Sequence, residues 1–167
     1  TDLLKKRDQY DQKIDKTVKQ IINSVKKDPN RSVIEFTNKF DKLAVKKIDE
    51  LIVSKGELDK AYNLTRKDIK SSLLTAISRI KSYHKKQQPI NTMYKDKEGV
   101  LLGGLWNPLE SVGLYVPGGT AAYPSSLIMN AVPAIVAGVG RIVVTVPATN
   151  GTVNHLVLVC CNVLKIS

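Results

Sequence analysis

A chain of 167 residues is long enough to bury one core of ordinary size, and its 43% apolar and 25% charged residues are typical of a folded protein rather than a disordered one. The sequence has no apolar run of about 18 residues, which argues against a membrane span, and its first residues lack the apolar core of a secretory signal. The only cysteines, Cys160 and Cys161, are adjacent and cannot link distant parts of the chain. We therefore expect a cytoplasmic protein.

The net charge of +11 is distributed unevenly along the chain. Residues 1–100 carry 24 Lys and Arg against 14 Asp and Glu, whereas residues 101–167 carry two against one. A basic half beside an apolar half is compatible with a module that binds nucleic acid. A lysine-rich helical layer over a buried sheet has the same composition. We favour the second interpretation and expect no nucleic-acid partner, because few aromatics lie among the basic residues and no zinc-finger, basic-zipper or ribonucleoprotein signature occurs.

Helical periodicity dominates the first part of the chain. Apolar residues recur at helical spacing between residues 3 and 27, which predicts an amphipathic helix that ends at Asp28-Pro29-Asn30. A second, shorter helix is predicted over residues 33–40, where apolar side chains again share one side. The apolar residues 51–53 form a candidate for a short strand.

Two pairs of polar residues predict the next helix starts. Ser54 with Glu57 three residues later has the pattern of a capping box, in which each side chain bonds the backbone N–H of the other. Thr65 with Asp68 repeats this pattern with a weaker acid partner. The helix expected behind Thr65 is long, has one apolar face and ends near Lys86.

The pattern changes after residue 90. Residues 92–94 and 100–102 flank a polar segment and predict a β-hairpin. Two buried strands are predicted farther on, at residues 112–116 and 141–146, with an apolar helix over residues 125–137 between them. Pro133 predicts a kink or a break in that helix, and a last helix is expected from residue 153 to residue 164.

Strand, helix and strand in this order form a βαβ unit, so we expect the two strands to be parallel with a right-handed crossover. The predicted fold class is α/β, with an N-terminal helical layer followed by the βαβ unit of an incomplete parallel sheet.

The end of the first strand is the candidate site, since ligands of open α/β sheets bind beyond the carboxyl ends of strands. Tyr115 could stack on a nucleotide ring, and Pro117 with Gly118 lies where a ligand can approach the backbone closely. The helix that follows offers free N–H groups to a phosphate. Spacing alone equally allows Gly118-Gly119 to be a tight turn and Tyr115 a core aromatic, because no G-x-G-x-x-G motif follows the strand.

The same stretch carries a family resemblance. Residues 108–126, PLESVGLYVPGGTAAYPSS, closely resemble the signature block of histidinol dehydrogenases, and MNAVPA at residues 129–134 continues the likeness. Upstream, EFTNKFD at residues 35–41 and YHKKQ at residues 83–87 are similar to two helices of that family. The resemblance covers nearly the whole chain and weakens after Thr149.

The resemblance implies an activity and its cofactors. Histidinol dehydrogenases oxidise L-histidinol through histidinal to L-histidine, reduce two NAD molecules and bind one zinc ion per active site, as cytosolic homodimers with a Rossmann-like core. On this basis we expect residues 1–90 to be an N-terminal helical layer and residues 91–167 the first part of a truncated, Rossmann-like nucleotide-binding domain.

Only one nucleotide-contacting residue of the family falls within this chain, as Tyr115, and we add Pro117 and Gly118 as its neighbours. The family's zinc ligands (a glutamine, an aspartate and two histidines) lie downstream of the signature block, as does its glutamate–histidine acid/base pair. We therefore assign no catalytic residue and no metal ligand to this chain.

The histidines and cysteines of the chain agree with that assignment. His84 and His155 have neither a carboxylate nor a second histidine at ligand spacing. We therefore expect His84 to be a histidine at a helix end and His155 to be a packing or rim residue. Cys160 and Cys161 are expected to be small buried residues, because a lone adjacent pair is a poor start for a tetrahedral site.

Two classes of function remain open. One is an N-terminal enzyme fragment with half a nucleotide site and no chemistry, for which histidinol would be a substrate only in a complete enzyme. The other is a non-catalytic module that binds a nucleotide or a partner. In both, an incomplete sheet should expose a strand edge, so we expect either a homo-oligomer or association with a missing C-terminal half.

Overall fold

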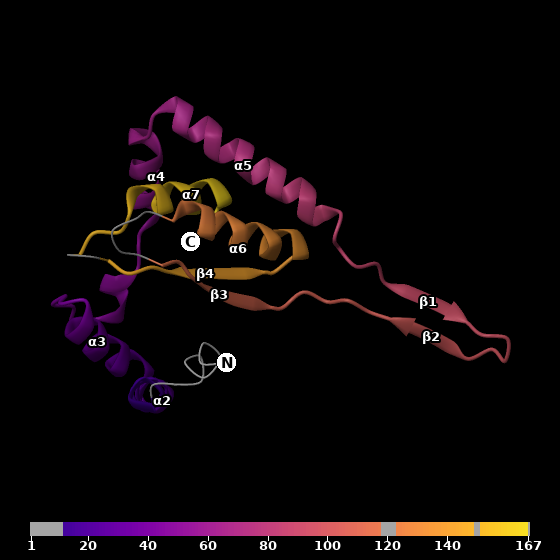
Figure 1. The fold of residues 1–167 in the computed structure, drawn as a ribbon, viewed down its shortest axis with the longest axis horizontal. Coiled ribbons are helices and arrows are strands. Elements are labelled where there is room, and N and C mark those ends of the chain that lie inside the picture. Colours follow the sequence, from indigo (N-terminus) through magenta and orange to yellow (C-terminus); the bar gives the residue numbers. More distant parts are fainter. Residues whose placement is uncertain (1–11, 118–122, 149–150, 167) are drawn as a thin grey trace, which may run out of the picture. The chain divides into compact units, whose positions relative to one another are not determined.

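A computed structural model of the protein describes residues 12–117, 123–148 and 151–166 (Figure 1). The chain divides into two compact units, Thr1–Ile52 and Val53–Ser167. The boundary expected between residues 90 and 91, where the helical layer would give way to the nucleotide-binding domain, stays a prediction. Within the described ranges, no helix is long and apolar enough to span a membrane.

The first unit is helical. It contains α2 (Gln12–Lys27), α3 (Pro29–Phe40) and the short 3₁₀ helix η1 (Ile48–Leu51). The predicted first helix is confirmed from residue 12 onward, and its residues 3–11 lie outside the described part. Helix α3 begins at Pro29, directly after the end of α2. Proline is well tolerated at a first helical position, because the N–H that it lacks would have no intrahelical partner there.

The strand predicted at residues 51–53 is wrong. Leu51 is the last residue of η1, and no strand is assigned there. The carboxylate of Glu50 accepts hydrogen bonds from the backbone N–H groups of Lys46 and Lys47, at 3.4 and 3.2 Å, which closes the chain into a tight turn. These two local hydrogen bonds outweigh the strand propensity of a three-residue apolar run.

Two helices open the second unit, α4 (Lys55–Leu64) and α5 (Lys67–Lys85). The Ser54 capping box is confirmed: the Glu57 N–H donates to Ser54 Oγ at 3.3 Å, and the Ser54 N–H donates to Glu57 Oε2 at 2.8 Å. The second predicted box is wrong, although its helix forms. The residue that caps α5 is Arg66, while Thr65 is buried and its hydroxyl donates to Ala61 O at 2.9 Å.

The predicted hairpin is confirmed. Strands β1 (Thr92–Lys95) and β2 (Leu101–Gly104) pair antiparallel. Asp96 holds the turn, since its Oδ1 accepts hydrogen bonds from the N–H groups of Glu98 and Val100, both at 2.9 Å. Gly99 supplies the positive φ of 84° that this turn needs.

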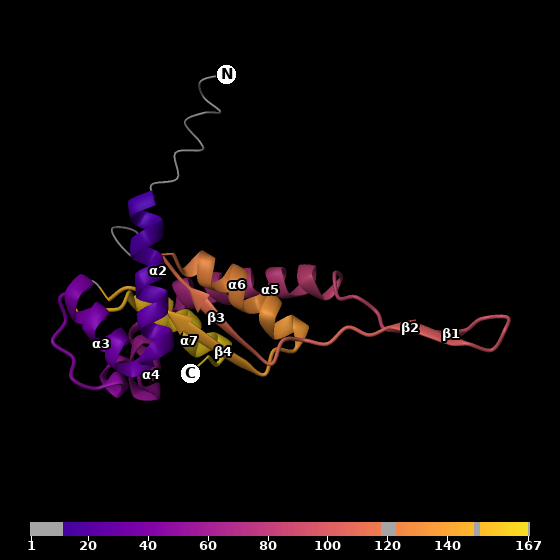
Figure 2. The ribbon, with the colours of Figure 1, turned by 90° about the horizontal axis from the view of Figure 1, so that it is seen from below.

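The rest of the second unit is the predicted βαβ arrangement, followed by a helix. It comprises β3 (Ser111–Tyr115), α6 (Pro124–Ala137), β4 (Arg141–Thr145) and α7 (His155–Leu164). Strands β3 and β4 pair in parallel, as Figure 2 shows from below. The described fold is therefore an incomplete α/β fold.

The core of this unit is built around α6. Four of its side chains, Leu127, Ile128, Ala131 and Val132, are buried together with Val116 at the end of β3. Helix α5 packs against α6, and α4 packs against α7. With packing on several sides, α6 continues through Pro133 without the break that the sequence allowed.

The prediction that both strands are buried is wrong for one of their faces. Exposure alternates along each strand: Val112 and Leu114 are half-buried, whereas Gly113 and Tyr115 are exposed. β4 shows the same alternation. Helix α6 packs against β3 on one face of this two-stranded sheet, and among the described residues of the second unit the alternate positions on the other face are exposed.

We predict that Leu127→Ala lowers the free energy of unfolding by about 2–5 kcal/mol, because it leaves a cavity at a side chain that is 0% exposed. Met129→Ala in the same helix is the matched control, since that side chain is 54% exposed and its loss should cost less than about 1 kcal/mol. Thermal and urea unfolding followed by circular dichroism measure both. Equal destabilisation by the two variants would contradict the described orientation of α6.

Candidate functional site

The carboxyl ends of β3 and β4 lie at one edge of the sheet. Tyr115 is in register with Thr145, and the N–H of Val116 donates to Thr145 O at 2.9 Å. Val116 is fully buried and anchors this edge, whereas the Tyr115 side chain is 65% exposed. The alternative that Tyr115 is a core aromatic is thereby excluded. Its ring stands at the edge where an open α/β sheet accepts ligands.

The start of α6 follows this edge along the chain. Pro117 is exposed, and Gly118 lies outside the described residues, so the glycine part of the predicted site has no structural account. Helix α6 begins at Pro124 without an acidic residue in its first turn. The partial positive charge of a helix N-terminus is therefore not neutralised by an acidic side chain of its own first turn, which favours an anionic neighbour.

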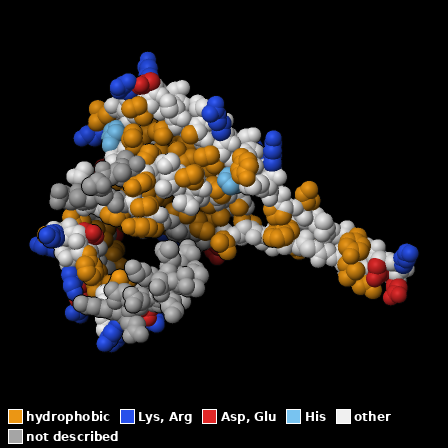
Figure 3. Space-filling model, viewed as in Figure 1, with side chains coloured by type: hydrophobic (Ala, Val, Ile, Leu, Met, Phe, Trp, Pro, Cys, Tyr) orange, Lys and Arg blue, Asp and Glu red, His pale blue; other side chains and the backbone are white. Residues whose placement is uncertain are grey.

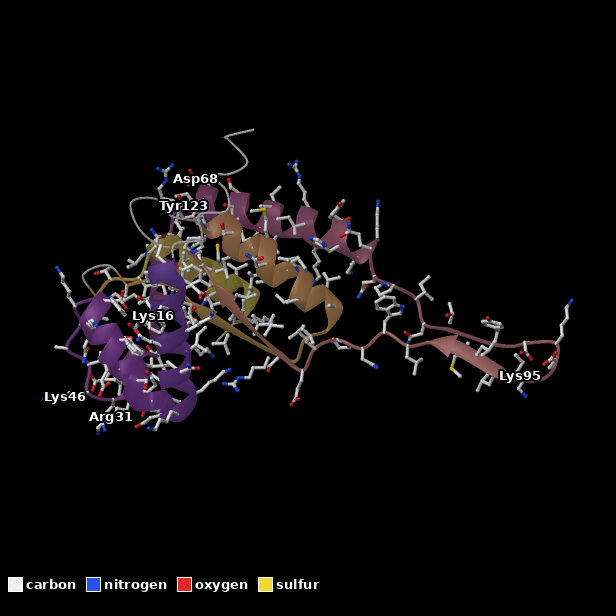
Figure 4. The ribbon with its side chains drawn as sticks, turned by 60° about the horizontal axis from the view of Figure 1, so that its bottom comes forward. Lys16, Arg31, Lys46, Asp68, Lys95 and Tyr123 are labelled. Atoms are coloured by element: carbon white, nitrogen blue, oxygen red, sulfur yellow. The ribbon has the colours of Figure 1, made fainter. Side chains whose placement is uncertain are left out.

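Tyr123 is a residue that sequence reasoning did not select. It caps α6, its side chain makes no capping hydrogen bond, and it is 42% exposed (Figure 4). The signal was the Tyr123-Pro124 pair, since proline is favoured at the first position of a helix and thus marks its preceding residue as the cap. Two exposed tyrosines therefore border the segment between β3 and α6.

The two histidines lie elsewhere in the second unit, as expected. His84 is in the last turn of α5, half-buried, with its ring edge-on to the neighbouring Tyr83. His155 is the first residue of α7 and is exposed, and its Nε2 lies 2.7 Å from Thr65 Oγ1. This bond joins the end of α4 to the start of α7.

The cysteines are buried thiols, as predicted. Burial raises the pKa of Cys160 to about 12, with a further contribution from the charge of Cys161, and burial raises the pKa of Cys161 to about 11. Both thiols therefore stay protonated at neutral pH and are poor nucleophiles and metal ligands. Across the described ranges, no group of three or more His, Cys, Asp or Glu side chains could hold a metal ion.

A shallow hollow of about 630 Å³ runs along α5. Its lining combines three cations with hydroxyls and one leucine: Lys67, Lys70, Ser71, Leu74, Thr75, Ser78 and Arg79. None of these side chains is a carboxylate, a histidine or a cysteine, so the hollow offers no carboxylate or imidazole base and no thiol nucleophile. We therefore place the candidate site at the strand ends.

Comparison with known proteins identifies the family. The model of the family "Histidinol dehydrogenase" matches residues 4–167 of the chain. The chain belongs to the histidinol dehydrogenase family. The resemblance of the segment around Tyr115 is thus part of a match that extends over nearly the whole sequence.

Curated relatives in this histidinol dehydrogenase family are similar over most of the chain. The histidinol dehydrogenase of Neisseria gonorrhoeae is 45% identical over 144 residues, which is 86% of this chain and 34% of the relative. That of Mesorhizobium japonicum is 45% identical over 150 residues, 90% of this chain and 35% of the relative. The chain therefore spans about a third of the length of these relatives.

A solved structure agrees with the sequence comparison. The crystal structure of histidinol dehydrogenase from Elizabethkingia anophelis superposes with a TM-score of 0.83 at 27% identity. The superposition covers 92% of this chain and 35% of the crystallised one. The incomplete α/β fold is therefore similar to about a third of a histidinol dehydrogenase.

We predict that the buried thiols make stability depend on alkaline pH. The pKa of a cysteine thiol is near 9 in the unfolded chain, and burial raises it to about 12 at Cys160 and about 11 at Cys161 in the folded chain. The stability that this difference provides is fully present below pH 9 and is lost as the pH rises toward 11 to 12. The free energy of unfolding should therefore fall over this range more steeply in the natural chain than in a Cys160→Ala, Cys161→Ala double variant. Urea unfolding at pH 8, 9 and 10 compares the two, and parallel pH profiles would contradict the burial of the thiols.

Proposed function

We propose that this chain is the N-terminal part of an NAD- and zinc-dependent histidinol dehydrogenase, which oxidises L-histidinol to L-histidine in the cytoplasm, and that alone it is inactive. Membership of the family and the one-third coverage of its relatives support this proposal. The chain then supplies part of a nucleotide site, and the remaining two thirds of a family member supply the chemistry.

The exposed ring of Tyr115 carries the nucleotide part of the proposal. A tyrosine that is 65% exposed at the end of a parallel strand presents a flat face on which a base of NAD can stack. Pro117 borders the same edge, and Gly118 would let a ligand approach the backbone. The start of α6 has no acid in its first turn, so it can face the pyrophosphate without repulsion.

The described residues do not fit a zinc ion. His84 and His155 belong to different helices, each has a non-metal contact, and no cluster of ligands surrounds either one. We therefore assign zinc, and the acid/base step that it supports, to residues of a complete family member that lie outside the described part of this chain. L-Histidinol is accordingly a substrate only of the completed enzyme.

The absence of a metal-ligand cluster from the described residues also favours a second candidate function. A chain with a nucleotide-facing edge and no metal cluster in its described ranges could serve as a binding module that holds a nucleotide or a partner without transforming it. The two candidates differ in one respect: only the first regains dehydrogenase activity when the rest of the family sequence is supplied.

We predict weak NAD binding, with Kd on the order of 1 mM, because one strand end offers few contacts. Tyr115→Ala should weaken binding roughly tenfold, since base stacking contributes about 1–3 kcal/mol. Tyr94→Ala is the matched control, because its side chain is 59% exposed on β1, and it should leave the affinity unchanged. Ligand-observed NMR titration measures these affinities. A Kd in the low micromolar range, or equal losses in the two variants, would contradict the proposed site.

We predict that the chain alone shows no histidinol-dependent reduction of NAD above background, and that co-expression with the C-terminal two thirds of a relative restores it. The 45% identity to the Neisseria gonorrhoeae protein makes that relative a suitable donor. Absorbance at the NADH maximum follows the reaction, with zinc present and with a chelator as control. Activity of the isolated chain would refute the proposal, and co-purification without restored activity would favour the binding module.

A further inference from the structure

Helix α5 carries an excess of positive charge. The helix and its two capping residues, 66–86, contain seven Lys and Arg side chains and one acid, Asp68. Arg66 neutralises that acid, because its guanidinium donates to the Asp68 carboxylate at 3.1 and 2.5 Å. Figure 3 shows Lys and Arg side chains at intervals over α5, along the upper edge of the view. The segment has no second acid for its other six cations: Lys67, Lys70, Arg79, Lys81, Lys85 and Lys86.

Three of these cations line the hollow of about 630 Å³ along α5. They are Lys67, Lys70 and Arg79, and none of them takes part in an ion pair between described residues. The lining positions recur at spacings of three and four residues, so they share one side of the helix. A different side of α5 is apolar, and there Leu73 and Ile77 pack against the core. The hollow therefore lies on a side of α5 that the core of the second unit does not use.

The hollow is prepared for an anion by the groups around it. The Nζ of Lys70 lies 4.3 Å from the centroid of the Tyr62 ring, and the face of the ring attracts this half-buried cation and limits its movement. The hydroxyl of Thr75 donates to Ser71 O at 2.9 Å. The hydroxyls of Ser71 and Ser78 make no hydrogen bond to a described residue and are free to donate to a ligand. Cations and free hydroxyls together match the oxygens of a phosphate group, which only accept.

The length of the hollow requires more than one phosphate group. Lys67 and Arg79 are twelve positions apart, which is about 18 Å along an α-helix. A single phosphate cannot contact both side chains at once, whereas a chain of phosphates can. Lys85 follows Lys67 by 18 positions, or about five helical turns, and so extends the same side of the helix.

The composition of the hollow distinguishes a phosphate chain from other polyanions. The interface of an acidic protein partner has an apolar centre, but Leu74 is the only apolar side chain that lines the hollow among the described residues. Single-stranded nucleic acids stack their bases on aromatic side chains, and no described aromatic residue lines it. A phosphate chain without bases needs neither feature.

We propose that α5 binds linear inorganic polyphosphate along this hollow. Lys67 and Lys70 contact phosphates at one end of the bound stretch, and Arg79 with the Ser78 hydroxyl contacts phosphates at the other. The inference goes beyond the proposed nucleotide site at Tyr115 and does not depend on it. Excess NAD should therefore not displace polyphosphate.

Two double variants of the complete 167-residue chain test the proposal. Lys67→Gln with Arg79→Gln removes two exposed cations from the hollow, and Lys95→Gln with Lys97→Gln removes two exposed cations from the β1–β2 hairpin. Both variants lose the same charge, so their overall attraction for a polyanion is equal. Isothermal titration calorimetry with a linear polyphosphate should show a Kd that is at least about tenfold higher for the hollow variant at about 0.1 M salt, and unchanged for the hairpin variant.

The salt dependence of binding provides a second measurement. Each cation that contacts a phosphate contributes about 1 to the slope of log Kd against log salt concentration, so the hollow variant should lose about 2 from this slope and the hairpin variant nothing. Far-UV circular dichroism verifies that both variants remain folded. Equal affinities and slopes of the two variants would mean general attraction to a basic chain and would overturn the site, as would no measurable binding by the natural chain.

Two further polyanions identify the ligand. Polyglutamate and oligothymidylate with the same number of charges should each bind more weakly than polyphosphate, because the first lacks phosphates and the second adds bases for which the hollow has no aromatic surface. Polyglutamate that binds as tightly as polyphosphate would indicate an acidic protein partner. Oligothymidylate that binds as tightly or more tightly would indicate a nucleic acid. Either result would overturn the proposed ligand.

Discussion

The second unit depends on the parallel pairing of β3 with β4. Helix α6 connects these two strands along the chain. Parallel strands cannot be joined by a tight turn, so the chain must cross from one to the other through a helix that packs on the sheet. Helix α6 meets this requirement with four buried side chains and contacts both β3 and α7. The same crossover places the exposed Tyr115 at the strand end from which the chain leads to α6.

Local chemistry was predictable from the sequence wherever the interacting groups are close along the chain. The Ser54–Glu57 box and the Asp96 turn each join residues two to four positions apart, and both were found where the pattern placed them. The failures have tertiary or competing local causes. Threonine often caps helices, but the Thr65 hydroxyl instead forms hydrogen bonds with Ala61 O and with His155 Nε2. His155 is 90 residues away along the chain. Strand burial failed because an apolar strand sequence does not reveal whether one face or both will be covered.

The candidate site was predictable in part for the same reasons. The order of strand, helix and strand was enough to locate the edge, and Tyr115 ends its strand as expected. Whether its ring faces solvent depends on which face of the strand the helices cover. The residues around Tyr115 in the sequence do not determine which face that is. Tyr123 was missed because the proline after it marks it as a helix cap only when α6 is known to begin at Pro124. The hairpin of β1 and β2 is a third case: the hairpin was predicted, but its exposure on both faces is a property of the fold.

The bond between Thr65 and His155 fixes the tautomer of a histidine. A threonine hydroxyl has one proton, and that of Thr65 is donated to Ala61 O, so its oxygen can only accept from the imidazole. The ring must therefore carry a hydrogen on Nε2 in order to donate to Thr65. A threonine whose position in the sequence suggests a helix cap thus selects the tautomer of a histidine 90 residues away.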